Sequence, residues 1–254
     1  MIENTILRKN RKGHKALSFA LGFPSASLVE LAARAGFDAL HLDGEHGAFT
    51  PESVDLMCRV ANGFGMSVTA RVPDIAPSTI NLWLDRGVQG VVGPHIETGE
   101  EAQRLVDACL FPPAGRRSWG GGRGTEFNDG VRLGEAHGGK LGFARWSNRN
   151  TLILAQIESK RGYGNLDAIL KVRGLTGITG GPHDFAASLG HPGEPDHPER
   201  VSLTADAEAR ARKAGKRIAS DLMLMLSIEE TMLGSARDFV AKRAAEASGR
   251  KRSR

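Results

Sequence analysis

The stretch HLDGEHGAFT, residues 41–50, places two acidic side chains and two histidines within six positions, directly after an apolar run. Such groups are costly to place near a protein core unless they find partners or take part in chemistry. An imidazole ordinarily titrates near neutral pH, so His46 is our candidate for proton transfer. The alternative is a structural histidine in a turn. Asp43 and Glu45 are expected to hold the loop and to hydrate the site.

Two further acidic residues, Glu158 and Asp184, lie at the ends of the apolar runs TLILAQIES and GLTGITGG. If these runs are consecutive strands, the two carboxylates converge on one point. Two carboxylates without a thiolate suit a hard divalent cation, Mg²⁺ or Mn²⁺, while Co²⁺ or Zn²⁺ stays open. The alternatives are an ion pair of Glu158 with Arg161 or Lys160, and a helix N-cap for Asp184.

Charged and polar groups at three other positions also need partners. Arg71 lies in the otherwise apolar run SVTARV and must meet an anion, either a protein carboxylate or a substrate oxygen. Asp85 ends a predicted helix, where its charge opposes the helix dipole, so we expect a specific partner. The run GGPHD, residues 180–184, offers backbone N–H groups at a helix start that suit a substrate carboxylate.

Short apolar runs alternate with segments of helical spacing along the chain. The predicted strands are residues 15–21, 38–42, 67–72, 90–96, 151–159, 174–181 and 217–226. Gly36, Gly65 and Gly87 close three of the helical segments, and Thr98 with Glu101 has the spacing of a capping box. This alternation predicts parallel strands joined by right-handed crossovers.

We favour an α/β fold of the (β/α)₈ barrel type, with an eighth strand within the poorly patterned C-terminal region. An open doubly wound sheet is the alternative, although no G-x-G-x-x-G follows the first strand. In a barrel, catalytic groups gather at the C-terminal ends of the strands. Residues 112–150 contain ten glycines and little apolar periodicity, and we expect a long functional or mobile loop there.

Composition bounds the class of protein. The chain has 254 residues, of which 40% are apolar and 25% charged, as in a single globular domain, expected over residues 1–248. The sequence contains no membrane span and no secretory signal at its start, so we expect a cytoplasmic enzyme.

Cys58 and Cys109 are expected to be packed and reduced. The net charge of +5 owes four positives to the last five residues, so a solvated, disordered tail at 249–254 is favoured over a nucleic-acid patch.

Five motifs, in this order, resemble the HpcH/HpaI aldolase/citrate lyase family, the metal-dependent pyruvate aldolases. They are FDALHLDGEHG, TARVP, LWLDRGVQGVVGPHIETGEEAQRLVDACLFPPAGRR, LILAQIES and GITGGPHDFAASLGHPGEPDHPE. The resemblance implies a (β/α)₈ barrel of the phosphoenolpyruvate/pyruvate type, assembled as a homo-oligomer, a trimer of dimers with exchanged last helices. It also implies a class II aldolase that converts a 4-hydroxy-2-oxo acid to pyruvate and an aldehyde through a metal-bound enolate.

The resemblance also assigns roles to single residues. Glu158 and Asp184 correspond to the ligands of the divalent metal ion (Mg²⁺, Mn²⁺ or Co²⁺), and Gln156 to their neighbour in the substrate pocket. Arg71 corresponds to the arginine that holds the keto oxygen, His46 to the acid–base histidine, and Asp85 to the aspartate that orients it. The backbone amides of Gly181, His183 and Asp184 are expected to receive the substrate carboxylate.

Two other functions stay open at this point. The same enolate chemistry would serve another carbon–carbon lyase or synthase that acts on oxaloacetate or a citrate-like acid. A non-catalytic binding protein that uses its basic tail is the second alternative. The glycine-rich segment GGGRG and the chain after residue 216 depart from the family pattern, which bears on the choice of acceptor and on how the barrel closes.

Overall fold

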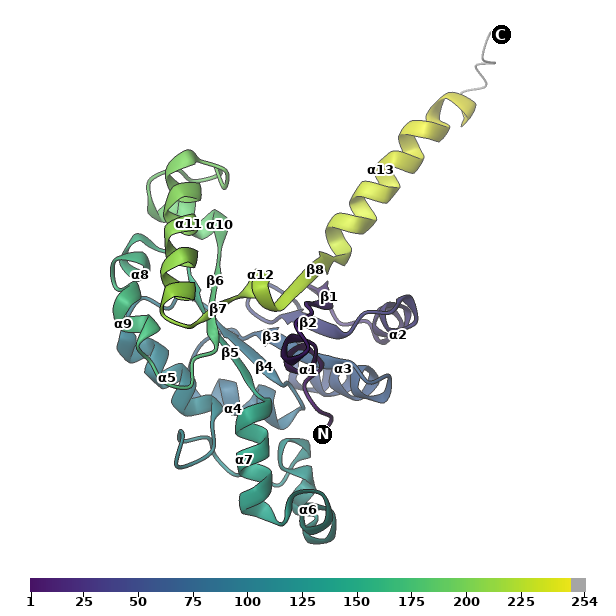
Figure 1. Ribbon diagram of the computed structural model, residues 1–254. Helices are drawn as coiled ribbons and strands as arrows, with labels where there is room; N and C mark the ends of the chain where they lie inside the picture. Colours follow the sequence, from purple (N-terminus) through teal and green to yellow (C-terminus); the bar gives the residue numbers. More distant parts are fainter. Residues whose placement is uncertain (248–254) are drawn as a thin grey trace.

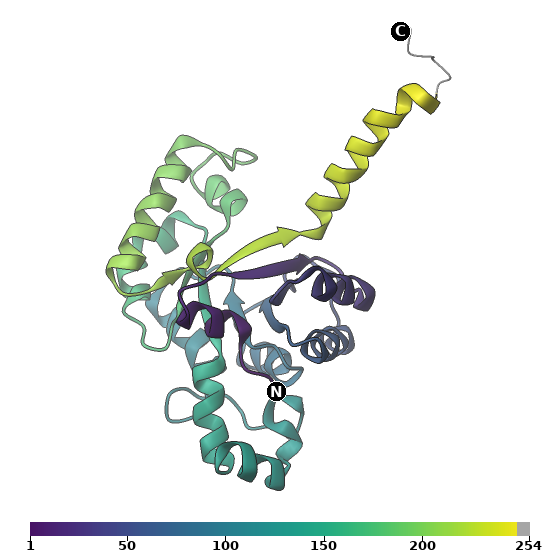
Figure 2. The same cartoon turned by 45° about the vertical axis from the view of Figure 1, so that its right-hand side comes forward.

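Eight parallel strands curl into a barrel-like sheet in the computed structural model, which describes residues 1–247 (Figures 1 and 2). The strands are β1 (Ala16–Leu21), β2 (Ala39–Asp43), β3 (Ser67–Arg71), β4 (Gly90–Gly93), β5 (Leu152–Ile157), β6 (Gly177–Gly180), β7 (Arg217–Ile218) and β8 (Met223–Ser227). Their order is β7-β6-β5-β4-β3-β2-β1-β8. The predicted barrel architecture is confirmed, and the expected basic tail lies outside the described residues.

The strands read as continuous apolar runs because both of their faces are covered. All six residues of β5 are buried, as are all four of β4. One face packs inside the barrel and the other packs against the surrounding helices, which is the arrangement typical of parallel sheets. The register places Asp43, at the end of β2, beside Arg71 at the end of β3.

The prediction of one strand over residues 217–226 was wrong. The run divides into β7, which pairs with β6, and β8, which pairs with β1, with the short helix α12 (Ala219–Leu222) between them. Ser220 and Asp221 interrupt the apolar run, because both favour turns and aspartate is unfavourable in strands, and Asp221 accepts two hydrogen bonds from Arg212. The expected eighth strand is therefore present as the second half of this run.

Helices follow most of the strands and surround the sheet. They are α1 (Thr5–Arg11), α2 (Ala26–Ala35), α3 (Pro51–Gly63), α4 (Pro77–Asp85), α5 (Gly99–Cys109), α8 (Lys160–Gly164), α9 (Leu166–Leu170), α10 (Pro182–Ser188) and α11 (Pro198–Lys213). The expected capping box is present at Thr98 and Glu101, and Gly36 ends α2 in the left-handed conformation.

The expectation of a long loop over residues 112–150 was wrong for its second half. That part forms the 3₁₀ segment η1 (Arg123–Asn128) and two helices, α6 (Gly130–His137) and α7 (Lys140–Asn150). Leu133 and Phe143 from these helices are buried with Phe111, which follows α5, in a small separate core. Glycines within both helices obscured their periodicity, although Asp129 caps the start of α6.

The N-terminal helix α1 closes one end of the barrel. The Thr5 backbone N–H donates to Ser67 at the start of β3, and the Asn4 side chain donates to the backbone of Gln89, directly before β4. Ile6 is fully buried in a cluster with apolar residues of β1, β2, β4, β5 and β8. The opposite end, where the strands finish, stays open for a site.

The last helix, α13 (Ile228–Ala247), projects away from the barrel as one long rod (Figure 1). Its first residue, Ile228, is buried, but farther along Met232, Leu233, Phe239 and Val240 are more than half exposed. The helix thus carries apolar side chains that the described chain leaves uncovered.

Two further predictions about the chain are tested by the structure. Cys58 and Cys109 are free and buried, as expected. Burial raises the pKa of the Cys109 thiol to about 12, so this thiol stays protonated at neutral pH. None of the described helices combines the length and the apolar character that crossing a membrane requires.

Candidate active site

Side chains from five neighbouring strands meet at the open end of the barrel, above a cavity of about 620 Å³. The cavity is lined by Asp43, His46, Arg71, Gln156, Gly181, His183 and Asp184, among others. Each of these residues lies at or just after the C-terminal end of its strand, where barrel enzymes place their catalytic groups. Seven of the ten candidate residues named from the sequence therefore share one cavity, whereas Glu45, Asp85 and Glu158 do not line it.

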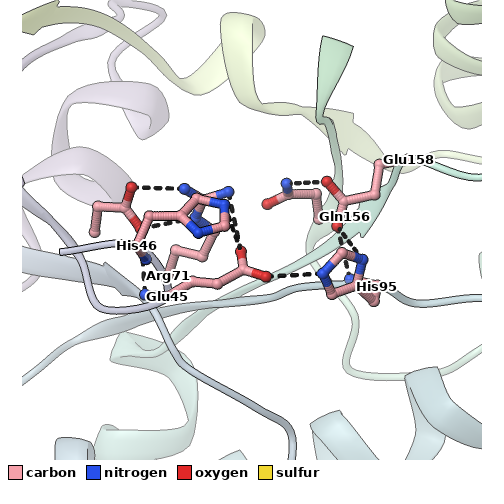
Figure 3. Close-up of polar contacts among 7 residues, drawn as sticks. Glu45, His46, Arg71, His95, Gln156 and Glu158 are labelled. Carbon is pink, nitrogen blue, oxygen red and sulfur yellow. Dashed lines mark hydrogen bonds and ion pairs between the residues drawn. The ribbon is translucent and has the colours of Figure 1, made fainter. Parts of the chain in front are cut away.

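Arg71 is held by two carboxylates. Its Nε and Nη2 donate to the two oxygens of Asp43 at 3.0 and 2.6 Å, and its Nη1 lies 3.0 Å from Glu45 Oε2 (Figure 3). The anion expected for Arg71 is thus a pair of protein carboxylates. Since a guanidinium has five N–H groups and these contacts use three, two remain for an oxygen in the cavity.

Asp43 and Arg71 stabilise each other's charge. Burial works to raise the pKa of the Asp43 carboxyl, but the hydrogen bonds and charge of Arg71 outweigh it and hold that pKa below its ordinary value. The backbone N–H groups of Glu45 and His46 also donate to Asp43. Asp43 therefore stays ionised and fixes both the arginine and the turn that carries His46.

His95 connects the two sides of the site. Its Nε2 lies 2.8 Å from Glu45 Oε1 and its Nδ1 lies 3.1 Å from Glu158 Oε1 (Figure 3). The residue has a φ of 50°, a conformation that a side chain other than glycine seldom adopts. No role was expected for His95 from the sequence. The structure makes it the link between Glu45 and Glu158.

Glu158 is buried, with 2% of its surface exposed. The backbone N–H of His95 donates to its Oε1 at 2.9 Å, and Gln156 Nε2 donates to its Oε2. A Cβ on Gly181 would lie 2.0 Å from that Oε2. The turn after β6 thus approaches the carboxylate so closely that any side chain at residue 181 would force the turn or the carboxylate to move.

Asp184 faces the same cavity from the first turn of α10. Its carboxylate is exposed and forms no hydrogen bond or ion pair with any other described residue. Gly181 occupies the N-cap position of α10, and no side chain caps that helix. The alternative role for Asp184 as an N-cap is therefore wrong. The alternative for Glu158, an ion pair with Arg161 or Lys160, is wrong too, because its carboxylate contacts Gln156 and His95 instead.

His46 and Asp85 lie apart from each other. The His46 side chain is 63% exposed at the cavity, with Glu45 3.9 Å from its Nε2. Asp85, at the end of α4, accepts from Asn81 at 3.1 Å and from the buried Arg117 at 3.4 Å, and it does not line the cavity. Asp85 thus has the specific partner that its position required, but that partner is Arg117. Its role in orienting His46 stays a prediction.

A residue from the last helix also reaches the cavity, which the sequence analysis missed. Glu229, in the first turn of α13, accepts a hydrogen bond of 2.7 Å from the backbone N–H of Gly22 and lines the cavity wall. Its position depends on β8, which the sequence did not separate from β7. No local pattern marked this glutamate.

The donor groups at this end of the barrel fit a divalent cation. Glu158 and Asp184 supply carboxylate oxygens, and neither cysteine is near, since both are buried among the helices. Asp184 has no competing partner among the described residues. Oxygen donors of this kind suit Mg²⁺ or Mn²⁺.

Comparisons with known proteins agree with this geometry. Residues 16–245 match the family described as HpcH/HpaI aldolase/citrate lyase. The chain is 33% identical over 214 residues to the 4-hydroxy-2-oxovalerate aldolase of Rhodococcus jostii strain RHA1, which covers 84% of this chain and 79% of that protein. It is 34% identical over 213 residues to the pyruvate aldolase of Rhizobium etli, covering 84% of this chain and 80% of that protein.

The fold comparison gives the same result. A crystal structure of an HpcH/HpaI aldolase/citrate lyase family protein from Burkholderia cenocepacia J2315 superposes with a TM-score of 0.81 at 26% identity. The match covers 95% of this chain and 99% of that one. The barrel fold is thus common to both proteins.

Proposed function

Because the chain belongs to the HpcH/HpaI aldolase/citrate lyase family, we propose that it is a class II pyruvate aldolase. The reaction is the reversible, divalent-metal-dependent cleavage of a 4-hydroxy-2-oxo acid to pyruvate, or a related 2-oxo acid, and an aldehyde. The observation that carries this proposal is the convergence of Arg71, Glu158 and Asp184 at one end of the barrel, with Arg71 and Asp184 facing one cavity.

Arg71 supplies the electrostatic part of the reaction. Glu158 and Asp184 would hold the divalent cation, which supplies Lewis acidity and a counter-charge at the keto oxygen of the substrate. The two free N–H groups of Arg71 would donate to that oxygen as negative charge develops on it. Because Asp43 and Glu45 fix the guanidinium beforehand, no reorganisation is needed when the charge appears.

The other cavity residues bind the substrate and move its protons. The backbone N–H groups of Gly181, His183 and Asp184, at the start of α10, would receive the substrate carboxylate, and Gln156 lies beside them. His46 is the exposed imidazole at the same cavity and would exchange a proton with the aldehyde oxygen or with C3 of pyruvate.

The test is pyruvate C3 proton exchange and oxaloacetate decarboxylation, with Mg²⁺, Mn²⁺ or Co²⁺ added to chelator-treated enzyme. We expect both activities to depend on the added cation, because both require the enolate but not the aldehyde. Glu158→Gln and Asp184→Asn should each abolish the stimulation, while Glu97→Gln, outside the cavity, should retain it. Full activity in the chelator, or activity that survives both changes, would contradict the proposal.

We also propose a cytoplasmic homo-oligomer as the working form, a hexamer built as a trimer of dimers. The exposed apolar side chains of α13 support an oligomer, since apolar groups gathered on an uncovered helix usually mark an interface.

A further inference from the structure

We propose that His191, His197 and Glu199 form a second metal site, suited to a borderline transition-metal ion such as Zn²⁺ or Co²⁺. Each of the three side chains offers one ligand atom, and these atoms all lie within 4.8 Å of one another. The loop between α10 and α11 supplies the two histidines, and the first turn of α11 supplies Glu199; none of the three lines the cavity at the barrel mouth.

Backbone hydrogen bonds fix the loop that carries His191 and His197, and Glu199 lies in the first turn of α11. His191 N–H donates to Ala186 at the end of α10, and His197 N–H donates to Glu194 within the loop. Gly190 and Gly193 take left-handed φ values of 96° and 83°, which close the turns. A fixed loop presents its ligands at a small entropic cost when an ion binds.

The side chains are already gathered. The rings of His191 and His197 stack with centroids 3.4 Å apart and an interplanar angle of 14°. His191 Nε2 lies 3.1 Å from Glu199 Oε2. Ligand atoms that bind one zinc ion at about 2.0–2.2 Å lie roughly 3–3.5 Å from one another. The three ligand atoms here lie within 4.8 Å of one another, so modest rotations of the two imidazole rings would bring all three to within binding distance of one ion.

The competing interactions within the cluster are weak. His197 Nδ1 accepts one hydrogen bond of 3.3 Å from the Glu199 backbone N–H, which is longer than a normal bond of this type. Glu194 and Asp196 add negative charge in the same loop, which offsets the positive end of the α11 dipole. An ion would replace a long hydrogen bond and a partly exposed histidine–carboxylate contact.

The donor chemistry separates this site from the active site. Two imidazoles and one carboxylate suit zinc-like ions, with a fourth position left to water, whereas the pair Glu158 and Asp184 suits harder ions. Bound there, the ion would tie the start of α11 to the loop after α10, the helix that carries Asp184. It should therefore stabilise the protein without entering the reaction.

The experiment uses the full chain with Glu158→Gln and Asp184→Asn, so that the barrel site cannot bind the probe. CoCl₂ is titrated in, and binding is followed by calorimetry and by visible absorption. We expect one equivalent to bind in this background. His191→Asn or His197→Asn, added to it, should weaken binding by about 100-fold or more, and Glu194→Gln, a matched change in the same loop, should leave it unchanged.

A second measurement covers the case in which a variant folds poorly. ZnCl₂ should raise the thermal midpoint of the background protein and of its Glu194→Gln variant, but not that of the two histidine variants. The proposal is overturned if the background binds no Co²⁺ or Zn²⁺, if neither histidine change weakens binding, or if Glu194→Gln weakens it equally. None of these readouts depends on aldolase activity, so the proposed function and this site can fail separately.

Discussion

At the scale of the residue, Arg71 is the side chain on which the proposed chemistry depends most. Its planar guanidinium group contacts the carboxylates of Asp43 and Glu45 at the same time and still has two N–H groups available for a substrate oxygen. A lysine keeps the charge but cannot reproduce the fork, so Arg71→Lys should lower kcat for the exchange reaction by about 100-fold or more. Steady-state kinetics measure this, with Arg34→Lys on the exposed face of α2 as control. A kcat close to that of the unchanged enzyme would make Arg71 structural.

His41 allows a prediction about pH. Burial lowers the pKa of its imidazole to about 4; the charge of Asp43 raises this pKa by a smaller amount, and the charge of Arg71 lowers it further. A histidine whose pKa is lower when folded than when unfolded, near 6.5, gives stability that is complete above pH 6.5 and lost as the pH falls toward 4. The loss amounts to up to about 3 kcal/mol in the free energy of unfolding.

Urea unfolding at pH 7 and at pH 4.5 tests this expectation against the variant His41→Gln, which lacks the titrating ring but can still contact Thr69. The unchanged protein should lose more stability between the two pH values than the variant does. An NMR titration should find the imidazole neutral down to about pH 4. Equal losses in the two proteins, or an imidazole that titrates at its ordinary pKa, would refute the prediction.

At the scale of the element, the turn between β6 and α10 sets the distance between Glu158 and the substrate cavity. In Gly181→Ala the new Cβ would lie 2.0 Å from Glu158 Oε2 and 2.8 Å from Gln156 Nε2, so the turn or the carboxylate must move. A displacement of about 1 Å in a catalytic site costs roughly 100-fold in rate, and we expect a loss of that size. Gly164→Ala, at the end of α8, has no heavy atom within 4 Å of the new Cβ and should remain active. Equal activity in the two variants would show that this close approach is not required.

Particular elements show which features of the fold and of the site could be predicted from the sequence alone. Strands such as β5 were predictable because burial on both faces makes them continuous apolar runs, and their ends then pointed to Arg71, Glu158 and Asp184. The division of residues 217–226 was not predictable, because β7 has only two residues and the four-residue helix α12 is too short to show a helical period. The position of His95 between two glutamates depends on an unusual backbone conformation that no pattern marks.

At the scale of the whole molecule, the exposed apolar side chains of α13 bear on the proposed assembly. Phe239 and Val240 are 65% and 63% exposed on a helix that leaves the barrel after its first turn (Figure 2). Burying a large apolar side chain stabilises a protein by about 1.5–3 kcal/mol. A single chain leaves these side chains of α13 exposed and therefore does not obtain this stabilisation. We therefore expect the helix to pack against another copy of the chain.

The pair of changes Phe239→Asp and Val240→Asp should shift the protein from an oligomer to smaller species, as measured by light scattering coupled to size exclusion. Lys242→Gln, on the same helix, should retain the assembly. Glu229 in the first turn of α13 lines the cavity, so the smaller species should also lose aldolase activity if the packing of the helix holds that turn in place. An unchanged mass for the paired variant, or a monomeric unchanged protein, would leave α13 without the proposed role in assembly.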